Sequence, residues 1–299
     1  MNPVEPAMAT IVVVGSGRIG AAADELLSMR REQRIQVDLD ARHRPVDLSE
    51  AYAVQALVVE GMLPDGEVPI GYKVACTSEI AQAALRIDRP VFGRLLPTTT
   101  SASGAVLPAD RFVHRVVEAE FAFRLGSDVT PHAGGHTHAS ISEHIDAAMP
   151  AIEIVDHRFE SWAIGALPVA ADNAIHGWWV HGAPVEAWRD LDLGRAEVVV
   201  RRNGEQITTG TGAAALGHPL TVMAWLADEL PKYGAALAAG DLVTTGVTTD
   251  VFEAGAGDHL RAEFAGLGVV DVTFDRQQSS SLRERPADRD PRSLASISG

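Results

Sequence analysis

The sequence predicts an α+β fold, in which a helical opening precedes a mixed β-sheet. Three observations support this. Helical periodicity is concentrated in the first part of the chain, strand-like segments follow, and the two do not alternate strictly as they would in a doubly wound sheet. With 299 residues, of which 46% are hydrophobic, the chain is long enough to bury a substantial core.

The helical opening consists of two segments. Apolar residues recur with helical spacing over residues 21–33 and again over 48–60, where Asp47 is placed to act as the N-cap. Further along, Thr77 or Ser78 is expected to cap a short helix that runs through Arg86. The segment 140–143 has the pattern of a capping box, which predicts a helix over 145–149.

The later part of the chain carries the strand signals. Residues 196–202 and 205–209 flank Asn203-Gly204, which predicts a β-hairpin with a type I′ turn. A helix is expected from His218-Pro219 to about Tyr233, bent near Pro231. Three more strands are predicted, near residues 241–245, 259–264 and 268–274. We therefore divide the chain into an N-terminal extension and helical segment (1–70), a catalytic β-sheet domain (71–275) and a disordered polar tail (276–299).

Composition and charge exclude several classes of function. The formal net charge of −15 repels phosphate backbones, and no basic cluster with interleaved aromatic residues is present, so we expect no nucleic-acid partner. The apolar stretch 7–14 is too short to span a membrane and lacks the basic flank of a secretion signal. The single cysteine, Cys76, rules out an internal disulfide, and we interpret it as an apolar filler rather than a nucleophile. We expect a cytoplasmic enzyme that acts on a small molecule.

Three acids are the most informative residues of the chain. Glu118 and Glu120 lie two residues apart in an apolar run, so on a strand they point to the same face. Glu153 lies in a second short strand-like run. Carboxylates beside large apolar residues are costly to desolvate unless a cation neutralises them, and three carboxylates suit Mg²⁺ or Mn²⁺ better than Zn²⁺. The alternative is that the acids line the solvated face of an antiparallel strand.

A glycine-rich segment near the N-terminus offers a competing interpretation. Residues 11–20 match the dinucleotide-binding fingerprint, and Asp38 and Asp40 lie near the distance of a ribose-binding acid. A working unit needs further parallel strands with crossover helices, and after Asp40 the sequence continues into a second helix instead. We therefore favour an N-terminal extension or a turn, and keep dinucleotide binding as the least favoured alternative.

Several ordered motifs accompany the acid pair. They are Gly71-Tyr72-Lys73-Val74, 87–93 (IDRPVFG), 150–158 (PAIEIVDHR), Ala171-Asp172-Asn173-Ala174, Leu216-Gly217-His218-Pro219 and 239–243 (AGDLV). With them, the chain from about Ala21 to Phe274 resembles the 2-keto-4-pentenoate hydratase branch of the fumarylacetoacetate hydrolase superfamily. The resemblance implies a mixed β-sheet roll that carries a metal site, preceded by a smaller helical segment.

The resemblance also implies roles for individual residues. Glu118, Glu120 and Glu153 match the ligands of one Mg²⁺ or Mn²⁺, and Lys73 matches a residue that faces the substrate and exchanges a proton. We expect the metal to lower the pKa of Lys73. Asp88 is the candidate for orienting Lys73 or a water molecule. Asp172, Thr245 and Gly246 are candidates for binding the substrate, the last two as a cradle for its carboxylate.

The activity implied by the resemblance is hydration of a 2-hydroxypenta-2,4-dienoate-like acid to a 4-hydroxy-2-oxo acid, in the breakdown of aromatic compounds. Alternatives are a 4-oxalocrotonate-type decarboxylase, which would need an extra Arg or Lys for a second carboxylate, and a C–C hydrolase. The sequence departs from the family after Lys73 (Val74 to Thr77), at His157 and after Ala174 (175–179), so the exact substrate is left open. We expect a homo-oligomer.

Overall fold

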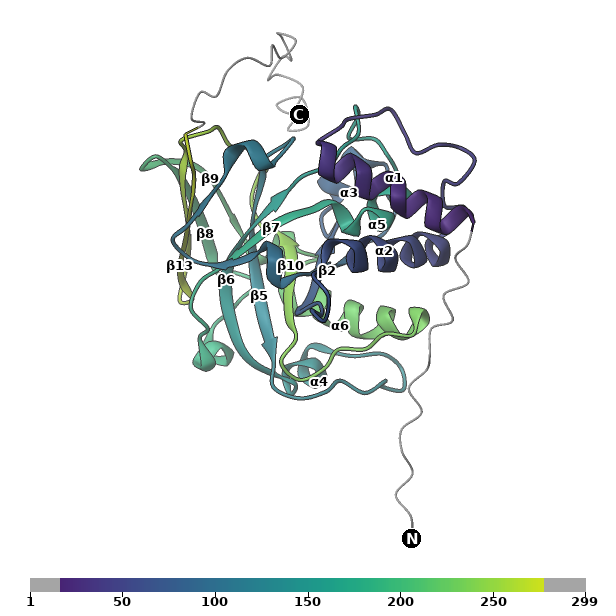
Figure 1. The fold of residues 1–299 in the computed structure, drawn as a ribbon. Helices are drawn as coiled ribbons and strands as arrows, with labels where there is room; N and C mark the ends of the chain where they lie inside the picture. Colours follow the sequence, from purple (N-terminus) through teal and green to yellow (C-terminus); the bar gives the residue numbers. More distant parts are fainter. Residues whose placement is uncertain (1–16, 277–299) are drawn as a thin grey trace.

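The computed structural model describes residues 17–276, which form two β-sheets with helices packed to one side (Figure 1). One sheet has eight strands and the other has five. The predicted α+β class and the helical opening are therefore confirmed. The predictions for residues 1–16 and for the tail beyond 276 lie outside the described residues.

The helical opening consists of α1 (Arg18–Glu32) and α2 (Leu48–Met62), which pack against each other and against α5 (Ala166–Ala171). Asp47 caps α2 as predicted, because its side chain accepts a hydrogen bond from the Glu50 amide. Arg18, Ile19 and Gly20 of the glycine-rich segment form the first turn of α1. The next element is α2, and the first strand of the described residues comes only at Gly71, so the third strand of a dinucleotide-binding unit does not follow here.

The eight-stranded sheet carries most of the predicted motifs. Its order is β2-β1-β10-β5-β6-β7-β3, and β11 pairs with the free end of β5. Pairing is mixed: β1–β10 and β3–β7 are parallel and the other pairs are antiparallel. The strands are β1 (Gly71–Ala75), β2 (Val91–Leu95), β3 (Thr100–Ala102), β5 (Val116–Leu125), β6 (Ile145–Val155), β7 (His176–His181), β10 (Leu242–Val247) and β11 (Phe252–Glu253).

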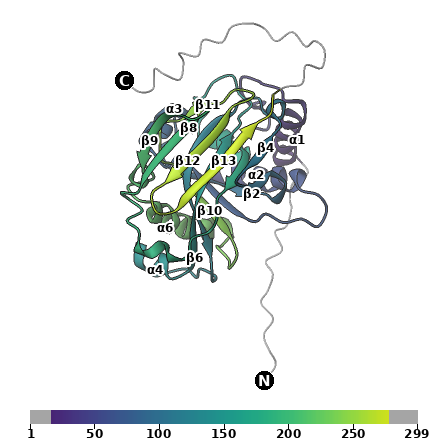
Figure 2. The ribbon, with the colours of Figure 1, turned by 90° about the vertical axis from the view of Figure 1, so that its left-hand side faces the viewer.

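The five-stranded sheet has the order β4-β13-β12-β8-β9 and faces the viewer in Figure 2. It confirms the predicted hairpin, because Asn203 and Gly204 both have positive φ (54° and 89°), as a type I′ turn requires. Its strands are β4 (Ala105–Leu107), β8 (Glu197–Arg202), β9 (Glu205–Thr211), β12 (His259–Phe264) and β13 (Gly268–Phe274).

Three further helices lie in the connections, and one prediction about them is wrong. Ser78 caps α3 (Glu79–Leu85), and α6 (Pro219–Glu229) is followed by a 3₁₀ turn that contains Pro231, both as expected. The predicted helix at 145–149 is instead the start of β6. The capping box is formed by Thr137 and Ser140, and its helix is the short α4 (His138–Ser142). Pairing of β6 on both sides, with β5 and β7, overrides the local helical signal.

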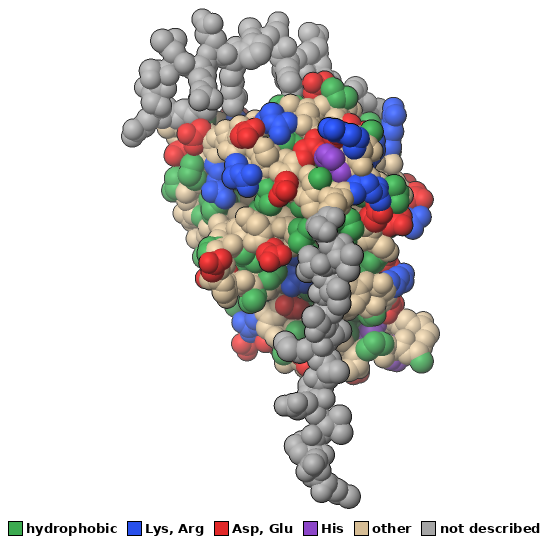
Figure 3. All heavy atoms as spheres, turned by 45° about the vertical axis from the view of Figure 1, so that its right-hand side comes forward, with side chains coloured by type: hydrophobic (Ala, Val, Ile, Leu, Met, Phe, Trp, Pro, Cys, Tyr) green, Lys and Arg blue, Asp and Glu red, His purple; other side chains and the backbone are tan. Residues whose placement is uncertain are grey.

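The surface is mixed in charge. On the face shown in Figure 3, acidic and basic side chains are interspersed and no continuous basic area is visible. Among residues 17–276, no helix is both long and apolar enough to cross a membrane.

Candidate metal centre and active site

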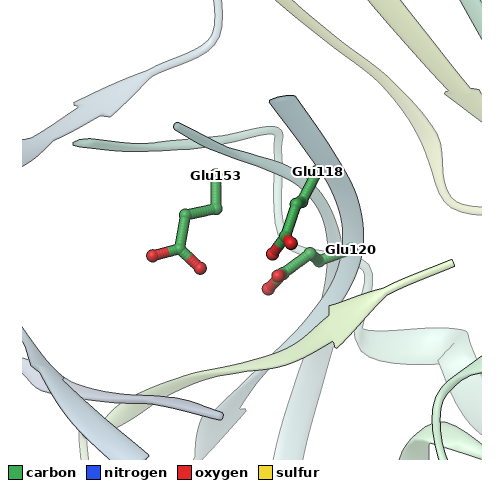
Figure 4. A group of neighbouring side chains, drawn as sticks. All are labelled: Glu118, Glu120 and Glu153. Carbon is green, nitrogen blue, oxygen red and sulfur yellow. The ribbon is translucent and has the colours of Figure 1, made fainter. Parts of the chain in front are cut away.

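Three carboxylates converge at the middle of the eight-stranded sheet. Glu118 and Glu120 point from β5, and Glu153 points from β6 toward them (Figure 4). Ligand atoms of all three lie within 4.8 Å of one another. The register explains the convergence, because Glu118 and Glu153 are direct cross-strand partners and Glu120 lies two residues further along the same face.

The same face continues across two more strands. Lys73 on β1 is the register partner of Thr244 on β10, and β10 lies between β1 and β5. The Thr244 hydroxyl donates a hydrogen bond to Glu120 Oε2. Adjacent strands therefore present a lysine, a threonine and three acids to a single surface.

Lys73 is held firmly at this site. Its side chain is 1% exposed, and its Nζ lies 3.1 Å from Glu153 Oε2. Nζ also donates to the Ala174 carbonyl over 3.0 Å. Ala174 can approach because Gly93, next to Lys73 in the sheet, has no side chain: a Cβ there would lie 2.6 Å from the Asn173 carbonyl oxygen. The structure thus supports the expected inward orientation of Lys73.

The electrostatics of the three acids differ. Burial raises the pKa of Glu118 to about 7, against the attraction of Lys73. Burial, with repulsion from Glu153 and Glu118, raises the pKa of Glu120 well above its ordinary value. Burial also opposes ionisation of Glu153, but Lys73 and a hydrogen bond from His176 lower its pKa below the ordinary value. The one nearby lysine does not neutralise the combined negative charge of the three carboxylates.

This arrangement fits a hard divalent cation. Glu120 Oε1 is buried and has no hydrogen-bond partner, and one lysine faces three carboxylates. Carboxylate oxygens are the ligands that Mg²⁺ and Mn²⁺ prefer, and a dication would neutralise the excess negative charge. The residues present could therefore hold such an ion.

The pKa of Lys73 differs from our expectation. Burial lowers the pKa of Lys73, but attraction to Glu153, Glu118 and Glu120 together raises it above the ordinary value. The expectation of a lowered pKa assumed a bound dication, and the protein's own groups act in the opposite direction. In the absence of a bound dication, the three carboxylates therefore keep the Lys73 amine protonated.

The raised pKa of Glu118 predicts how the stability of the metal-free protein depends on pH. An acid whose pKa is higher in the folded state binds more protons there, so stability is greatest below the unfolded pKa and falls as pH rises toward the folded one. A change from 4.5 to about 7 corresponds to at most on the order of 3 kcal/mol of unfolding free energy. In EDTA, we expect the melting temperature to fall as pH rises from the ordinary pKa of 4.5 to the folded pKa of about 7. We expect Mg²⁺ to remove most of that fall. A flat melting profile in EDTA would contradict the charge balance described here.

A cavity of about 250 Å³ reaches the acid cluster at Glu118. Lys73 and Glu118 are among its lining residues, and most of the remaining wall is apolar. Lys73 is the only cationic side chain among the described residues that line it. Of the positions where the sequence departs from the family, Ala75, Cys76 and Ile175 lie in this wall. Other lining residues are Ile80, Ala84, Leu85, Trp162 and Val251, with hydroxyls from Ser78, Thr209, Thr248 and Thr249.

Cys76 behaves as the sequence interpretation expects. It is 5% exposed, and burial raises the pKa of its thiol to about 12. A protonated thiol is a poor nucleophile, so Cys76 contributes apolar surface to the cavity wall.

Two candidate residues lie away from the cavity. Asp88 has a side chain that is 77% exposed, and its carboxylate pairs with Arg89 at 2.9 Å. Asp172 is fully buried, and its carboxylate is bound by Arg30 at 2.7 Å and Arg158 at 3.3 Å. The structure therefore does not bring Asp88 or Asp172 to the acids, although Asp172 anchors the turn whose Ala174 carbonyl contacts Lys73.

The threonine-glycine segment is placed differently from the expectation. Thr245 points to the other face of β10, where its hydroxyl donates to the Phe121 carbonyl, and neither Thr245 nor Gly246 lines the cavity. Gly246 has φ of 86°, and a Cβ there would lie 2.0 Å from Thr77 Oγ1. Because Gly246 has no side chain, the backbone can form the bulge in β10 at this position.

Sequence reasoning missed two residues that contact the acids. Thr244 directly precedes the predicted Thr245-Gly246 pair, but only the register with Lys73 shows that Thr244, and not Thr245, faces Glu120. His176 is buried and its Nδ1 lies 2.8 Å from Glu153 Oε1. The only sequence signal for His176 was its place in a segment that departs from the family.

Comparison with known proteins agrees with this geometry. The family model described as fumarylacetoacetate (FAA) hydrolase C-terminal matches residues 73–275. The chain is 36% identical over 254 residues to "2-keto-4-pentenoate hydratase 1" of Dechloromonas aromatica (strain RCB), covering 85% of this chain and 96% of the relative. It is 32% identical over 219 residues to "2-hydroxypent-2,4-dienoate hydratase" of Pseudomonas putida, covering 73% of this chain and 98% of the relative.

A solved structure shows the same fold. The 4-oxalocrotonate decarboxylase from Pseudomonas putida G7, complexed with magnesium and adipate, superposes with a TM-score of 0.80 at 27% identity, covering 86% of this chain and 97% of that chain. The match extends beyond the 73–275 region and includes much of the helical opening. The chain belongs to the fumarylacetoacetate hydrolase family, and within it to the group that contains the 2-keto-4-pentenoate hydratases.

Proposed function

We propose that this protein is a metal-dependent hydratase that converts 2-hydroxypenta-2,4-dienoate-like acids to 4-hydroxy-2-oxo acids. The observation that carries the proposal is the cavity: Lys73 and Glu118 line it, Glu120 and Glu153 have ligand atoms within 4.8 Å of Glu118, and most of the remaining wall is apolar. This arrangement suits a substrate with one polar end and one apolar end. The names of the relatives, hydratases at 32–36% identity, support the same reaction.

Glu118, Glu120 and Glu153 would hold one Mg²⁺ or Mn²⁺, with Thr244 orienting Glu120. When bound, the ion supplies a Lewis acid for the 1-carboxylate and 2-oxygen of the substrate and stabilises negative charge on that oxygen. The relative that was solved with magnesium supports this choice of ion.

Lys73 is the residue that we assign to proton transfer. Formation of the 2-oxo-3-enoate moves one proton, because the 2-hydroxyl loses a proton and C5 gains one, and we assign Lys73, whose Nζ lies beside the acids, to carry it. Water then adds at C4, and Ser78, which lines the cavity, is a candidate to hold it. The overall change is addition of one water molecule, with no carbon lost. Asp88 has no part in this proposal.

One observation speaks for the decarboxylase alternative, namely the structural similarity to the 4-oxalocrotonate decarboxylase. A second substrate carboxylate would require another basic group, but Lys73 is the only cation among the described cavity residues, and Asp250 lies in the same wall. The geometry therefore favours a substrate with one carboxylate.

The reaction is tested with freshly generated 2-hydroxypenta-2,4-dienoate and Mg²⁺ or Mn²⁺. We expect loss of the dienol absorbance and formation of 4-hydroxy-2-oxopentanoate without release of CO₂. If the monocarboxylate is untouched and 2-oxo-3-hexenedioate yields CO₂ in a metal-dependent manner, the protein is a decarboxylase instead. Assembly as a homo-oligomer and a cytoplasmic location are separate proposals, and light scattering in solution would test the first.

A further inference from the structure

His176 occupies an unusual position beside the acids. It is the first residue of β7, it is completely buried, and both nitrogens of its ring have partners. Nδ1 lies 2.8 Å from Glu153 Oε1, and Nε2 lies 3.0 Å from Thr99 Oγ1. A buried imidazole held at both ends has a fixed position and orientation.

The direction of the two hydrogen bonds follows from the donor inventory. An ionised carboxylate can only accept, so Nδ1 carries the hydrogen and donates it to Glu153. In a neutral ring Nε2 must then accept, and the Thr99 hydroxyl is the donor. The Glu153 carboxylate therefore selects the ring form, and the Thr99 hydroxyl holds the ring in place at Nε2.

The hydrogen bond from His176 therefore holds Glu153 at Oε1. Oε2 makes no hydrogen bond and forms an ion pair with Lys73, whose Nζ lies 3.1 Å away. Each oxygen keeps a further lone pair, so these contacts leave the carboxylate able to coordinate a cation. A hydrogen bond to a ligating carboxylate restricts its rotation, and loss of such a partner typically weakens metal binding about 10- to 100-fold.

We propose that His176, oriented by Thr99, is a positioning residue that sets Glu153 for metal binding in this protein. The inference rests on the proposed metal site, but not on the identity of the substrate. The main chain supports the assignment, because Arg30 donates to the His176 carbonyl over 3.1 Å and ties the start of β7 to α1. Thr99 is 2% exposed and immediately precedes β3, which pairs with β7.

The test is Mn²⁺ binding to the full chain, measured by calorimetry and by the electron paramagnetic resonance signal of free Mn²⁺. His176→Phe should weaken binding about 10- to 100-fold. His176→Asn, whose amide nitrogen can stand near the position of Nδ1, should recover most of the affinity. Thr99→Val should weaken binding to a smaller but measurable extent, because the imidazole ring loses the partner that holds its Nε2 in place.

A matched control comes from the same strand. Trp178→Phe removes a hydrogen bond from β7 to Ser101 and leaves Glu153 untouched, so it should bind Mn²⁺ like the wild type. Melting in EDTA reports whether each variant folds. If His176→Phe does not fold, Thr99→Val decides the question, and wild-type affinity in folded Thr99→Val would overturn the inference.

The result is distinguishable from failure of the proposed reaction. If the protein binds Mn²⁺ with an affinity that depends on His176 but hydrates no dienoate, this inference stands and the substrate assignment fails. If the wild-type protein binds no Mn²⁺, both the role of His176 and the proposed metal-dependent reaction are contradicted.

Discussion

Replacing Glu120 by alanine is expected to abolish metal-dependent activity and to leave the fold intact. Glu120 is fully buried, its Oε1 has no hydrogen-bond partner, and its pKa is raised by burial and by the neighbouring acids. Its charge therefore destabilises the metal-free protein, and removing it relieves repulsion while it deletes a ligand. Loss of metal assistance worth several kcal/mol corresponds to at least about 10²-fold in kcat/KM.

Three measurements check this expectation. Calorimetry with Mg²⁺ should show binding that is lost or severely weakened in Glu120→Ala. Glu120→Gln, which keeps the side-chain volume, should melt in EDTA at a temperature equal to or above that of the wild type. The matched control is Glu205→Gln on the exposed strand β9, which should change neither property. Full activity of Glu120→Ala would exclude the three acids as the metal site.

Replacing Lys73 by methionine is expected to give the second large effect. The variant loses the proton carrier at the polar end of the cavity and keeps much of the side-chain volume, so the rate should fall about 10²- to 10⁴-fold. Metal binding should persist or tighten, because the substitution removes a positive charge that lies 3.1 Å from Glu153.

The two readouts separate a catalytic role from a structural one. Lys73→Met should bind Mn²⁺ at least as tightly as the wild type while its kcat falls. Lys232→Met is the control, because Lys232 is exposed and its ion pair with Glu229 lies outside the cavity. A Lys73→Met protein that turns over at the wild-type rate would contradict the assignment of Lys73, and one that no longer binds metal would point to a structural role.

Several parts of the fold and site were fixed by local sequence. The two-residue spacing of Glu118 and Glu120 places them on one face of any strand, so the acid pair was predictable from the period of a β-strand alone. Asn203-Gly204 specified its turn, and Asp47 and Ser78 specified the starts of α2 and α3, because caps and tight turns depend on neighbouring residues. The motifs that resemble the family added Lys73 and Glu153.

Only the tertiary structure decided the rest, because it depends on contacts between distant segments. The segment 145–149, which was predicted as a helix, became the start of β6 because the strand pairs on both sides. The register of β1 with β10 turned Thr244 rather than Thr245 toward Glu120. Asp172 is buried and forms ion pairs with Arg30 and Arg158, whereas Asp88 lies at the surface. A carboxylate next to a motif can pair with any cation within reach, and the fold alone determines which cation that is.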